Sequence, residues 1–200
     1  MNILIPLNSE YLINRYSMSR DFVFQIVNSI MPNLVDRLSS DGRVAKIDIM
    51  SNLDLGWLRS SSSKITVYKH DTGLSNQFYK IVSEYIHISN YDKEILVVYN
   101  PLFHFITVDK IYNGYSAIVD NLCNSAIGTY SNHHRLDNTD LASQYDYGIL
   151  SIVRLRDFLR VKSRLCEPIN FVNLDAINLV SLRNSSDHDL FELIVNSGVL

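Results

Sequence analysis

Residues 95–115 read ILVVYNPLFHFITVDKIYNGY, and this stretch combines a strand, a turn and a helix. Its first residues are all apolar, which is typical of a strand that is buried on both faces of a parallel sheet. Asn100 and Pro101 break the strand, and Thr107 is a residue type that often begins a helix. The pattern predicts a strand in the middle of a sheet, followed by a helix.

Strand-like and helix-like segments alternate on both sides of this stretch, which is typical of a parallel α/β sheet. The strands are predicted at 2–6, 44–50, 65–68, 94–99, 125–130, 147–153 and 169–174. The helices are predicted at 22–32, 75–88, 107–121, 155–164 and 188–196. We therefore expect an α/β fold of three layers (α/β/α), Rossmann-like, with a mostly parallel sheet of about seven strands.

The boundaries of three segments carry further expectations. The first predicted helix should end at Pro32, because proline cannot donate the next backbone hydrogen bond. Ser186 and Asp187 should cap the last helix. Residues 7–16 and 131–146 are polar and are expected as loops. The sequence has no internal repeat and no shift in composition, so we expect one domain over residues 1–200.

The composition excludes several classes of protein. Apolar residues make up 46% of the 200 residues and charged residues 20%, which indicates a globular chain. The net charge of −3 gives no basic excess for nucleic acid. No apolar run is long enough to span a membrane, and the start MNILIPLNSEY lacks the basic region of a signal peptide. We expect a cytoplasmic protein with two reduced cysteines and neither a nucleic-acid nor a membrane partner.

Three local patterns follow one another in an order that is known from one family. Residues 100–105 form a proline turn after the central strand, and residues 107–111 begin a helix with Thr and reach Ile. Residues 146–150, DYGIL, follow a polar loop, and Asp187 stands near the start of the last helix. This order resembles the acylneuraminate cytidylyltransferase family, whose members make CMP-sugar acids on the nucleotide-diphospho-sugar transferase fold. The resemblance covers nearly the whole chain.

The resemblance implies a reaction and a place for it. A hydroxyl of a sugar acid would attack the α-phosphate of CTP and release pyrophosphate, with Mg²⁺ as cofactor. The site would lie at the carboxyl ends of the first, second and fourth strands. By this resemblance, the nucleotide would bind at Pro6, Asn8, Ser9, Asn52 and Asn100. The catalytic cations would be Arg15 and Arg20. The resemblance also implies surface-polysaccharide or sialic-acid-like sugar biosynthesis, and a homodimer.

The sequence departs from the family where phosphate and metal would bind. The Gly-Ser-Lys that follows the family's first strand is absent, and the seven glycines of this chain are scattered. Glu10 adds negative charge where the triphosphate would lie. The family's closing pair of acids falls on Ser181 and Arg183, and an arginine cannot ligate Mg²⁺. We therefore predict no metal ligands in these motifs.

Three hypotheses of function stay open. The first is a cytidylyltransferase-like protein with weakened or lost catalysis that keeps a cleft of nucleotide size. The second is a non-catalytic interaction or regulatory protein that uses the fold as a scaffold. The third is an active transferase that uses Arg15 and Arg20 on phosphate, and Asp48 or Asp187 on Mg²⁺. Arginines turned into a cleft near carboxylates would favour the enzyme, and a first loop packed across the cleft would favour the scaffold.

Three other groups of residues have both a functional and a structural interpretation. His133 and His134, with two nearby aspartates, are either a metal cluster or part of a solvated loop. Asp48 and Asp54 either bind a nucleotide or lie as acids at the end of a strand and the start of a helix. The predicted helix over 155–164 either holds an anionic sugar or an acidic partner, or presents a solvated face. Its cations are Arg154, Arg156, Arg160, Lys162 and Arg164.

Overall fold

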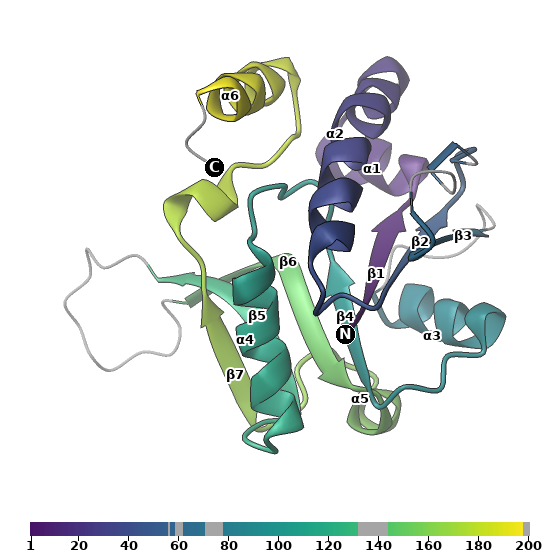
Figure 1. The fold of residues 1–200 in the computed structure, drawn as a ribbon, viewed down its shortest axis with the longest axis vertical. Helices are drawn as coiled ribbons and strands as arrows, with labels where there is room; N and C mark the ends of the chain where they lie inside the picture. The colour runs from purple at the N-terminus through teal and green to yellow at the C-terminus, as the bar shows by residue number, and fades with distance from the viewer. Residues whose placement is uncertain (56, 59–61, 71–77, 132–143, 198–200) are drawn as a thin grey trace.

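The computed structural model describes residues 1–55, 57–58, 62–70, 78–131 and 144–197, which fold into three layers (Figure 1). The strands are β1 (Asn2–Leu7), β2 (Lys46–Ser51), β3 (Ile65–Lys69), β4 (Ile95–Tyr99), β5 (Ser125–Ser131), β6 (Gln144–Arg154) and β7 (Ile169–Asn173). The helices are α1 (Ser9–Tyr16), α2 (Arg20–Ser40), α3 (Phe78–Ser89), α4 (Val108–Val119), α5 (Leu155–Val161) and α6 (Ser185–Asn196), with a short 3-10 helix, η3 (Ala176–Leu179). Each predicted strand and helix has its counterpart among these elements.

One sheet of seven strands runs through the molecule in the order β3-β2-β1-β4-β6-β5-β7. The strands β1 to β4 pair in parallel, as do β5 and β7, whereas β6 is antiparallel to both of its neighbours. The prediction of a mostly parallel sheet is confirmed. The prediction that residues 95–99 lie centrally is also confirmed, since β4 is buried along its whole length and is the fourth of the seven strands.

Side chains on alternate positions of the strands enter two separate cores, which explains the three layers. Ile3 and Ile5 of β1 pack on the side of α2 and α4. Leu4, between them, packs on the other side, where Tyr85 of α3 and Phe158 of α5 lie. Helices therefore cover both faces of the sheet.

The helix that was predicted to end at Pro32 continues to Ser40, so this boundary was wrong. A proline inside a helix costs about 3 kcal/mol. Burial outweighs this cost, because each fully buried Leu, Met or Val side chain contributes roughly 1.5–3 kcal/mol. The side chains after the first turns keep the helical spacing and are fully buried at Met31, Leu34, Val35 and Leu38.

Two further expectations about helices need correction. Residues 9–16 form the helix α1, where a polar loop was predicted. The helix α6 begins at Ser185, and Asn184 caps it by accepting a hydrogen bond from the Asp187 N–H at 3.0 Å. Asp187 reinforces this end of the helix from inside, because its carboxylate accepts a hydrogen bond from the Arg183 N–H. Among the described residues, no helix combines the length and hydropathy needed to cross a membrane.

Candidate functional site at the carboxyl ends of the strands

The predicted site residues follow β1, β2 and β4 at one edge of the sheet. Leu7 and Ser51 end neighbouring parallel strands and lie opposite each other. Asn8 and Asn52 come directly after them, so the two asparagines leave the sheet at the same edge. Asn100 follows β4 on the other side of β1. The fold thus brings together the three asparagines that were assigned to nucleotide binding.

Asn52 forms a two-point contact with the start of α1. Its Oδ1 accepts a hydrogen bond from the Ser9 N–H at 2.9 Å, and its Nδ2 donates to the Ser9 Oγ at 2.9 Å. The free N–H groups at a helix N-terminus are the groups that bind phosphate in many nucleotide sites. Here the side chain of Asn52, the residue after β2, already accepts a hydrogen bond from the Ser9 N–H and so positions α1 over the carboxyl edge of the sheet.

Asn8 and Pro6 lie deeper than a surface loop would place them. The Asn8 carbonyl accepts the first hydrogen bond of α1, from the Leu12 N–H at 3.1 Å, and Asn8 is buried. Pro6 lies within β1, opposite Met50. Leu12 packs into the main core, with only 3% of its surface exposed, and therefore holds α1 against the body of the protein.

Asn100 shapes the turn after the central strand. Its Oδ1 accepts a hydrogen bond from the Leu102 N–H at 3.1 Å, and its own N–H donates to the Ile149 carbonyl of β6 at 2.9 Å. Arg37 of α2 fixes the rest of this turn, because its guanidinium donates to the carbonyls of His104 and Ile106. Burial, together with the positive charge of the nearby Arg37, lowers the pKa of His104 to about 3.

A pocket of about 220 Å³ lies between α1 and α2 at this edge. It combines one acid, one cation and apolar side chains, and its lining residues are Ser9, Glu10, Ile13, Arg20, Val23, Phe24 and Leu53. Arg20, assigned as a catalytic cation, therefore faces the same pocket as Glu10. The side chain of Arg15, the other assigned cation, lies outside what the structure describes.

Sequence reasoning missed most of the pocket wall. Residues 9–16 carry the apolar side chains Leu12 and Ile13, but their polar neighbours favoured a loop. The exposed Phe24 of α2 was not singled out, although 54% of its surface is accessible. The α1 side of the wall is formed by Ser9, Glu10 and Ile13, which follow one another too closely to give a clear amphipathic pattern.

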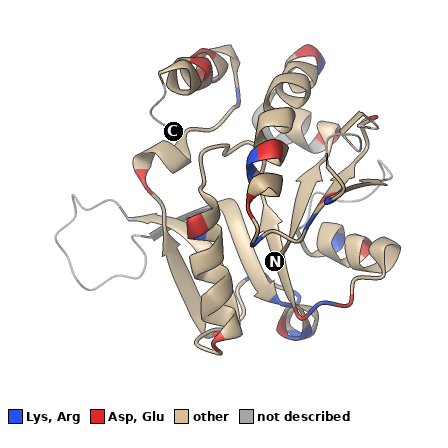
Figure 2. Cartoon of the chain, viewed as in Figure 1, with Lys and Arg blue, Asp and Glu red and all other residues tan. Residues whose placement is uncertain are grey.

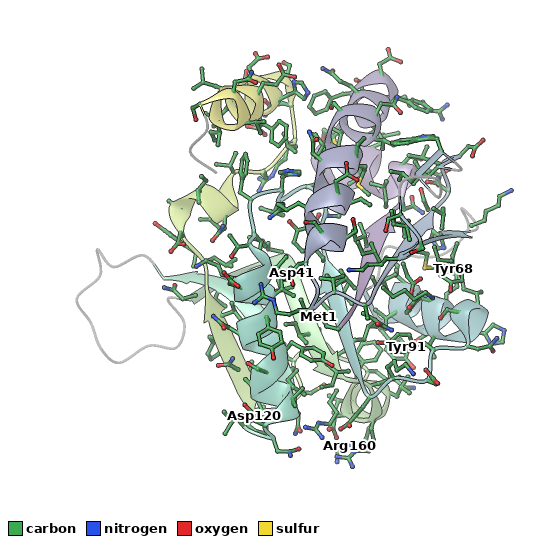
Figure 3. The ribbon with its side chains drawn as sticks, in the orientation of Figure 1. Met1, Asp41, Tyr68, Tyr91, Asp120 and Arg160 are labelled. Carbon is green, nitrogen blue, oxygen red and sulfur yellow. The ribbon has the colours of Figure 1, made fainter. Side chains whose placement is uncertain are left out.

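The carboxylates that could have held Mg²⁺ are engaged elsewhere. Asp48 is fully buried within β2, where it accepts a hydrogen bond from the Tyr85 hydroxyl at 2.5 Å and pairs with Lys46 at 2.9 Å. Figure 3 shows Tyr68, whose hydroxyl also contacts Lys46, beside α3 and away from α1. Asp187 stabilises the start of α6. These acids do not fit a magnesium site, and the described residues contain no cluster of His, Cys, Asp and Glu that could hold a metal.

Arg183, one of the two positions where the sequence resemblance would place an acid, stands near the carboxyl end of β4. The Leu182 N–H donates to the Leu102 carbonyl at 3.0 Å, so residues 181–183 run beside the turn after β4. The Arg183 guanidinium lies 6.0 Å from the centre of the Phe103 ring, within the range of a cation–π contact. This part of the edge is therefore cationic.

The remaining predicted groups lie elsewhere. Residues 132–143, with His133, His134, Asp137 and Asp140, lie outside the described residues. In the basic segment, Arg154 turns inward, because its guanidinium pairs with Glu94 at 2.6 Å and donates to the Ile118 carbonyl. Asp54 is exposed, just after the end of β2.

A larger cavity, of about 340 Å³, lies at the opposite edge of the sheet. Asn2 and Ile95 at the amino ends of β1 and β4 line it, together with Tyr91, Tyr115 and Arg154. The sequence resemblance gave no reason to expect a cavity there.

Comparison with known proteins agrees with this architecture. No family model matches the chain, and a search of curated proteins finds no related sequence. Among solved structures, the 4-diphosphocytidyl-2C-methyl-D-erythritol synthase of Anaerococcus prevotii superposes with a TM-score of 0.67 at 10% identity, over 98% of this chain and 95% of that one. The 2-C-methyl-D-erythritol 4-phosphate cytidylyltransferase of Francisella tularensis gives 0.62 at 13% identity, over 96% and 98%. At such low identity the likeness establishes the fold alone. The chain has the three-layer α/β fold seen in these two proteins.

Proposed function

We propose that this chain is a cytidylyltransferase-like protein in which catalysis is weakened or lost, while a cleft remains at the carboxyl edge of the sheet. The observation that carries the proposal is the Asn52 contact with Ser9. It occupies an N–H at the start of α1, where an incoming phosphate would need a free donor.

The charges around the pocket support this proposal. A transferase must neutralise charge that develops on phosphate oxygens, and it uses cations and Mg²⁺ to do so. Here Glu10 shares the pocket with Arg20, and Asp48 and Asp187 are engaged in structural contacts. The Glu10 carboxylate would repel a triphosphate in this pocket. No described acid is placed to coordinate Mg²⁺ beside it.

CTP is the nucleotide to test, because the superposed Francisella protein is named as a cytidylyltransferase. The second substrate would be a sugar acid, as the sequence resemblance implies, or a polyol phosphate such as the one in the name of the Francisella protein. The setting would then be surface-polysaccharide or sialic-acid-like sugar biosynthesis in the cytoplasm, with a homodimer as the assembly.

Pyrophosphate release tests the proposal. Purified protein is incubated with CTP, Mg²⁺ and either a sialic-acid-type sugar or 2-C-methyl-D-erythritol 4-phosphate. We expect a rate equal to that of the reaction without protein. Turnover that disappears in Arg20→Ala, but persists in the matched variant Arg156→Ala at an exposed site on α5, would contradict the loss of catalysis.

A non-catalytic interaction or regulatory protein is the second candidate. The segment after β1 is folded inward, with Leu12 and Met18 in the core. Phe24 meanwhile presents an exposed aromatic surface beside the pocket. If CTP neither binds nor reacts, a partner that changes the intrinsic fluorescence of the protein and loses affinity for Phe24→Ala would support this candidate.

A further inference from the structure

The cavity of about 340 Å³ lies at the amino edge of the sheet, away from the pocket beside α1. Asn2 and Ile95, at the amino ends of β1 and β4, are part of its lining. In Figure 1 both strands point upward, so their amino ends lie on the side of the molecule away from α1. The proposed function uses no residue of this edge.

Arg154 brings a buried positive charge to the cavity wall. It ends β6, opposite Ile95, and its side chain is only 11% exposed. The guanidinium donates hydrogen bonds to the Ile118 carbonyl at 2.7 Å and to the Asn121 Oδ1 at 2.8 Å, and it pairs with Glu94 at 2.6 Å. These contacts fix the guanidinium at the wall and leave some of its N–H donors unused.

The counter-ion of Arg154 lies at the surface rather than inside the cavity wall. The side chain of Glu94 is 66% exposed. An ion pair with so exposed a partner is weak, because water screens the charges and competes for the carboxylate. An anionic group in the cavity would therefore compete with Glu94 for the guanidinium at little cost.

Positive charge exceeds negative charge around the cavity. Lys93 and Arg154 are its basic lining residues, and Glu94 is its acidic one. Figure 2 shows basic and acidic residues close together at the start of β4. The Lys93 ammonium also pairs with Asp92 at 3.1 Å, but both side chains are well exposed, so this pair is weak as well.

Several neutral donors at the cavity have no partner within the described part of the chain. Neither the Tyr115 hydroxyl nor the side-chain amide of Asn2 forms a hydrogen bond there, although both residues line the cavity. Asn121 uses its Oδ1 on Arg154, which leaves its Nδ2 available. Hydroxyl and amide N–H groups beside cations are the groups that bind carboxylate and phosphate oxygens.

Two tyrosines give the cavity a fixed aromatic wall. The Tyr91 hydroxyl donates to the Ile95 carbonyl at 2.7 Å, and its ring lies 5.4 Å from that of Tyr85. The Tyr115 ring stacks on that of Tyr112 at 6.4 Å. A wall that is already ordered lowers the entropic cost of binding. The volume is near the lower end of the range for small-molecule sites, about 300–1,000 Å³.

We propose that this cavity binds a small organic anion. Its carboxylate or phosphate group would lie beside Arg154 and Lys93, and its body, about the size of one ring, against Tyr91 and Tyr115. Arg154 also ties the end of α4 to the sheet, but that structural role requires neither a cavity beside it nor unpartnered donors around it. The site is separate from the carboxyl edge and does not depend on the proposed function.

Benzoate and benzamide provide the first test, because they have nearly the same size and shape and differ in charge. Each is titrated into isotope-labelled protein while the backbone amide signals are followed by NMR. We expect benzoate to bind with a dissociation constant on the order of 1 mM and to shift the amides of residues 91–95 and 115–121. Benzamide should bind at least about tenfold more weakly. Binding is counted per chain, so the test applies equally to a homodimer.

Phenyl phosphate, titrated in the same way, identifies the anionic group. Tighter binding than benzoate would assign the site to phosphate esters, and weaker binding would assign it to carboxylates. Either result supports the proposal, provided that the same amides shift.

Substitutions at exposed cavity residues change the affinity in opposite directions. Glu94→Gln removes the competing carboxylate and should tighten benzoate binding about two- to fivefold. Lys93→Met should weaken it by a similar factor. The matched controls are Glu192→Gln on α6 and Lys80→Met on α3, both exposed and outside the cavity lining, and they should leave the affinity unchanged.

The Tyr115 hydroxyl gives a neutral test at the same site. Tyr115→Phe removes a donor that no described residue uses, so the fold should be unaffected while benzoate binds about two- to fivefold more weakly. Tyr112→Phe, one helical turn away and outside the cavity lining, is its control. Thermal transitions verify that each variant is folded.

Three results would overturn the proposal. The first is that neither anion shifts the amides of the cavity up to about 20 mM, well above the expected dissociation constant. The second is that benzamide binds as tightly as benzoate, since charge would then play no part. The third is that benzoate binds equally to the natural protein and to folded Glu94→Gln, Lys93→Met and Tyr115→Phe, which would place it elsewhere.

Discussion

Mild acid should destabilise this protein through one buried histidine. His104 lies in the turn after β4, where only 5% of its surface is exposed and its Nδ1 has no hydrogen-bond partner among the described residues. Its ring packs edge-on against Phe191 at 4.9 Å and Phe105 at 5.5 Å. Burial first, and the positive charge of Arg37 second, lower its pKa to about 3.

The size of the effect follows from the difference between the folded and unfolded pKa values. An unfolded histidine has a pKa of about 6.5. As the pH falls below that value, His104 becomes protonated in the unfolded chain but stays neutral in the folded protein. The free energy of unfolding therefore decreases between about pH 6.5 and pH 3. Between pH 7 and pH 5 the loss is about 2 kcal/mol, from 1.4 kcal/mol per pH unit over about 1.5 units.

Urea unfolding at pH 7 and pH 5 measures this loss, and His104→Phe is its control. Phenylalanine keeps an aromatic ring between Phe105 and Phe191 but does not titrate. We expect the variant to lose about 2 kcal/mol less stability than the natural protein on going from pH 7 to pH 5. Equal losses in the two proteins would refute the assignment of this effect to His104.

Three further substitutions test the contacts that hold the fold. Asn52→Ala removes the acceptor for the Ser9 N–H and should cost about 1 kcal/mol in urea unfolding; a neutral result would mean that water replaces the Asn52 contact with α1 at no cost. Tyr85→Phe leaves the buried Asp48 without its hydroxyl donor and should cost about 1–3 kcal/mol, whereas Tyr112→Phe at an exposed site on α4 should cost little. Gly114→Ala places a Cβ 2.8 Å from a methyl group of β-branched Val172 and should lower stability by about 1 kcal/mol; Gly42→Ala meets nothing within 4 Å and is its control.

The sheet could be predicted because each strand has a local sequence signal, a short run of apolar residues. Residues 95–99 are apolar without interruption, and the alternation of strands and helices leaves few other arrangements. The helix α2 shows the limit of a local rule. Pro32 predicted the end of the helix, but the buried apolar residues that follow it stabilise the helix as far as Ser40.

The site was harder to predict, because its contacts join residues that are distant in sequence. The Asn52 side chain accepts a hydrogen bond from the Ser9 N–H at the start of α1. Nothing in the sequence of residues 7–16 indicates this contact. The carboxylate of Asp48 could have been a ligand, but a tyrosine on α3 engages it inside the protein. Sequence could place the asparagines at one edge, since that follows from strand order, but not the partners of their side chains.

A calorimetric titration with CTP tests whether the start of α1 can still bind a phosphate. CTP is titrated into the protein with and without Mg²⁺. We expect no magnesium-dependent binding and no detectable heat at millimolar nucleotide. Magnesium-dependent binding at micromolar strength, about −8 kcal/mol, would contradict it and would mean that other residues have rebuilt the phosphate site.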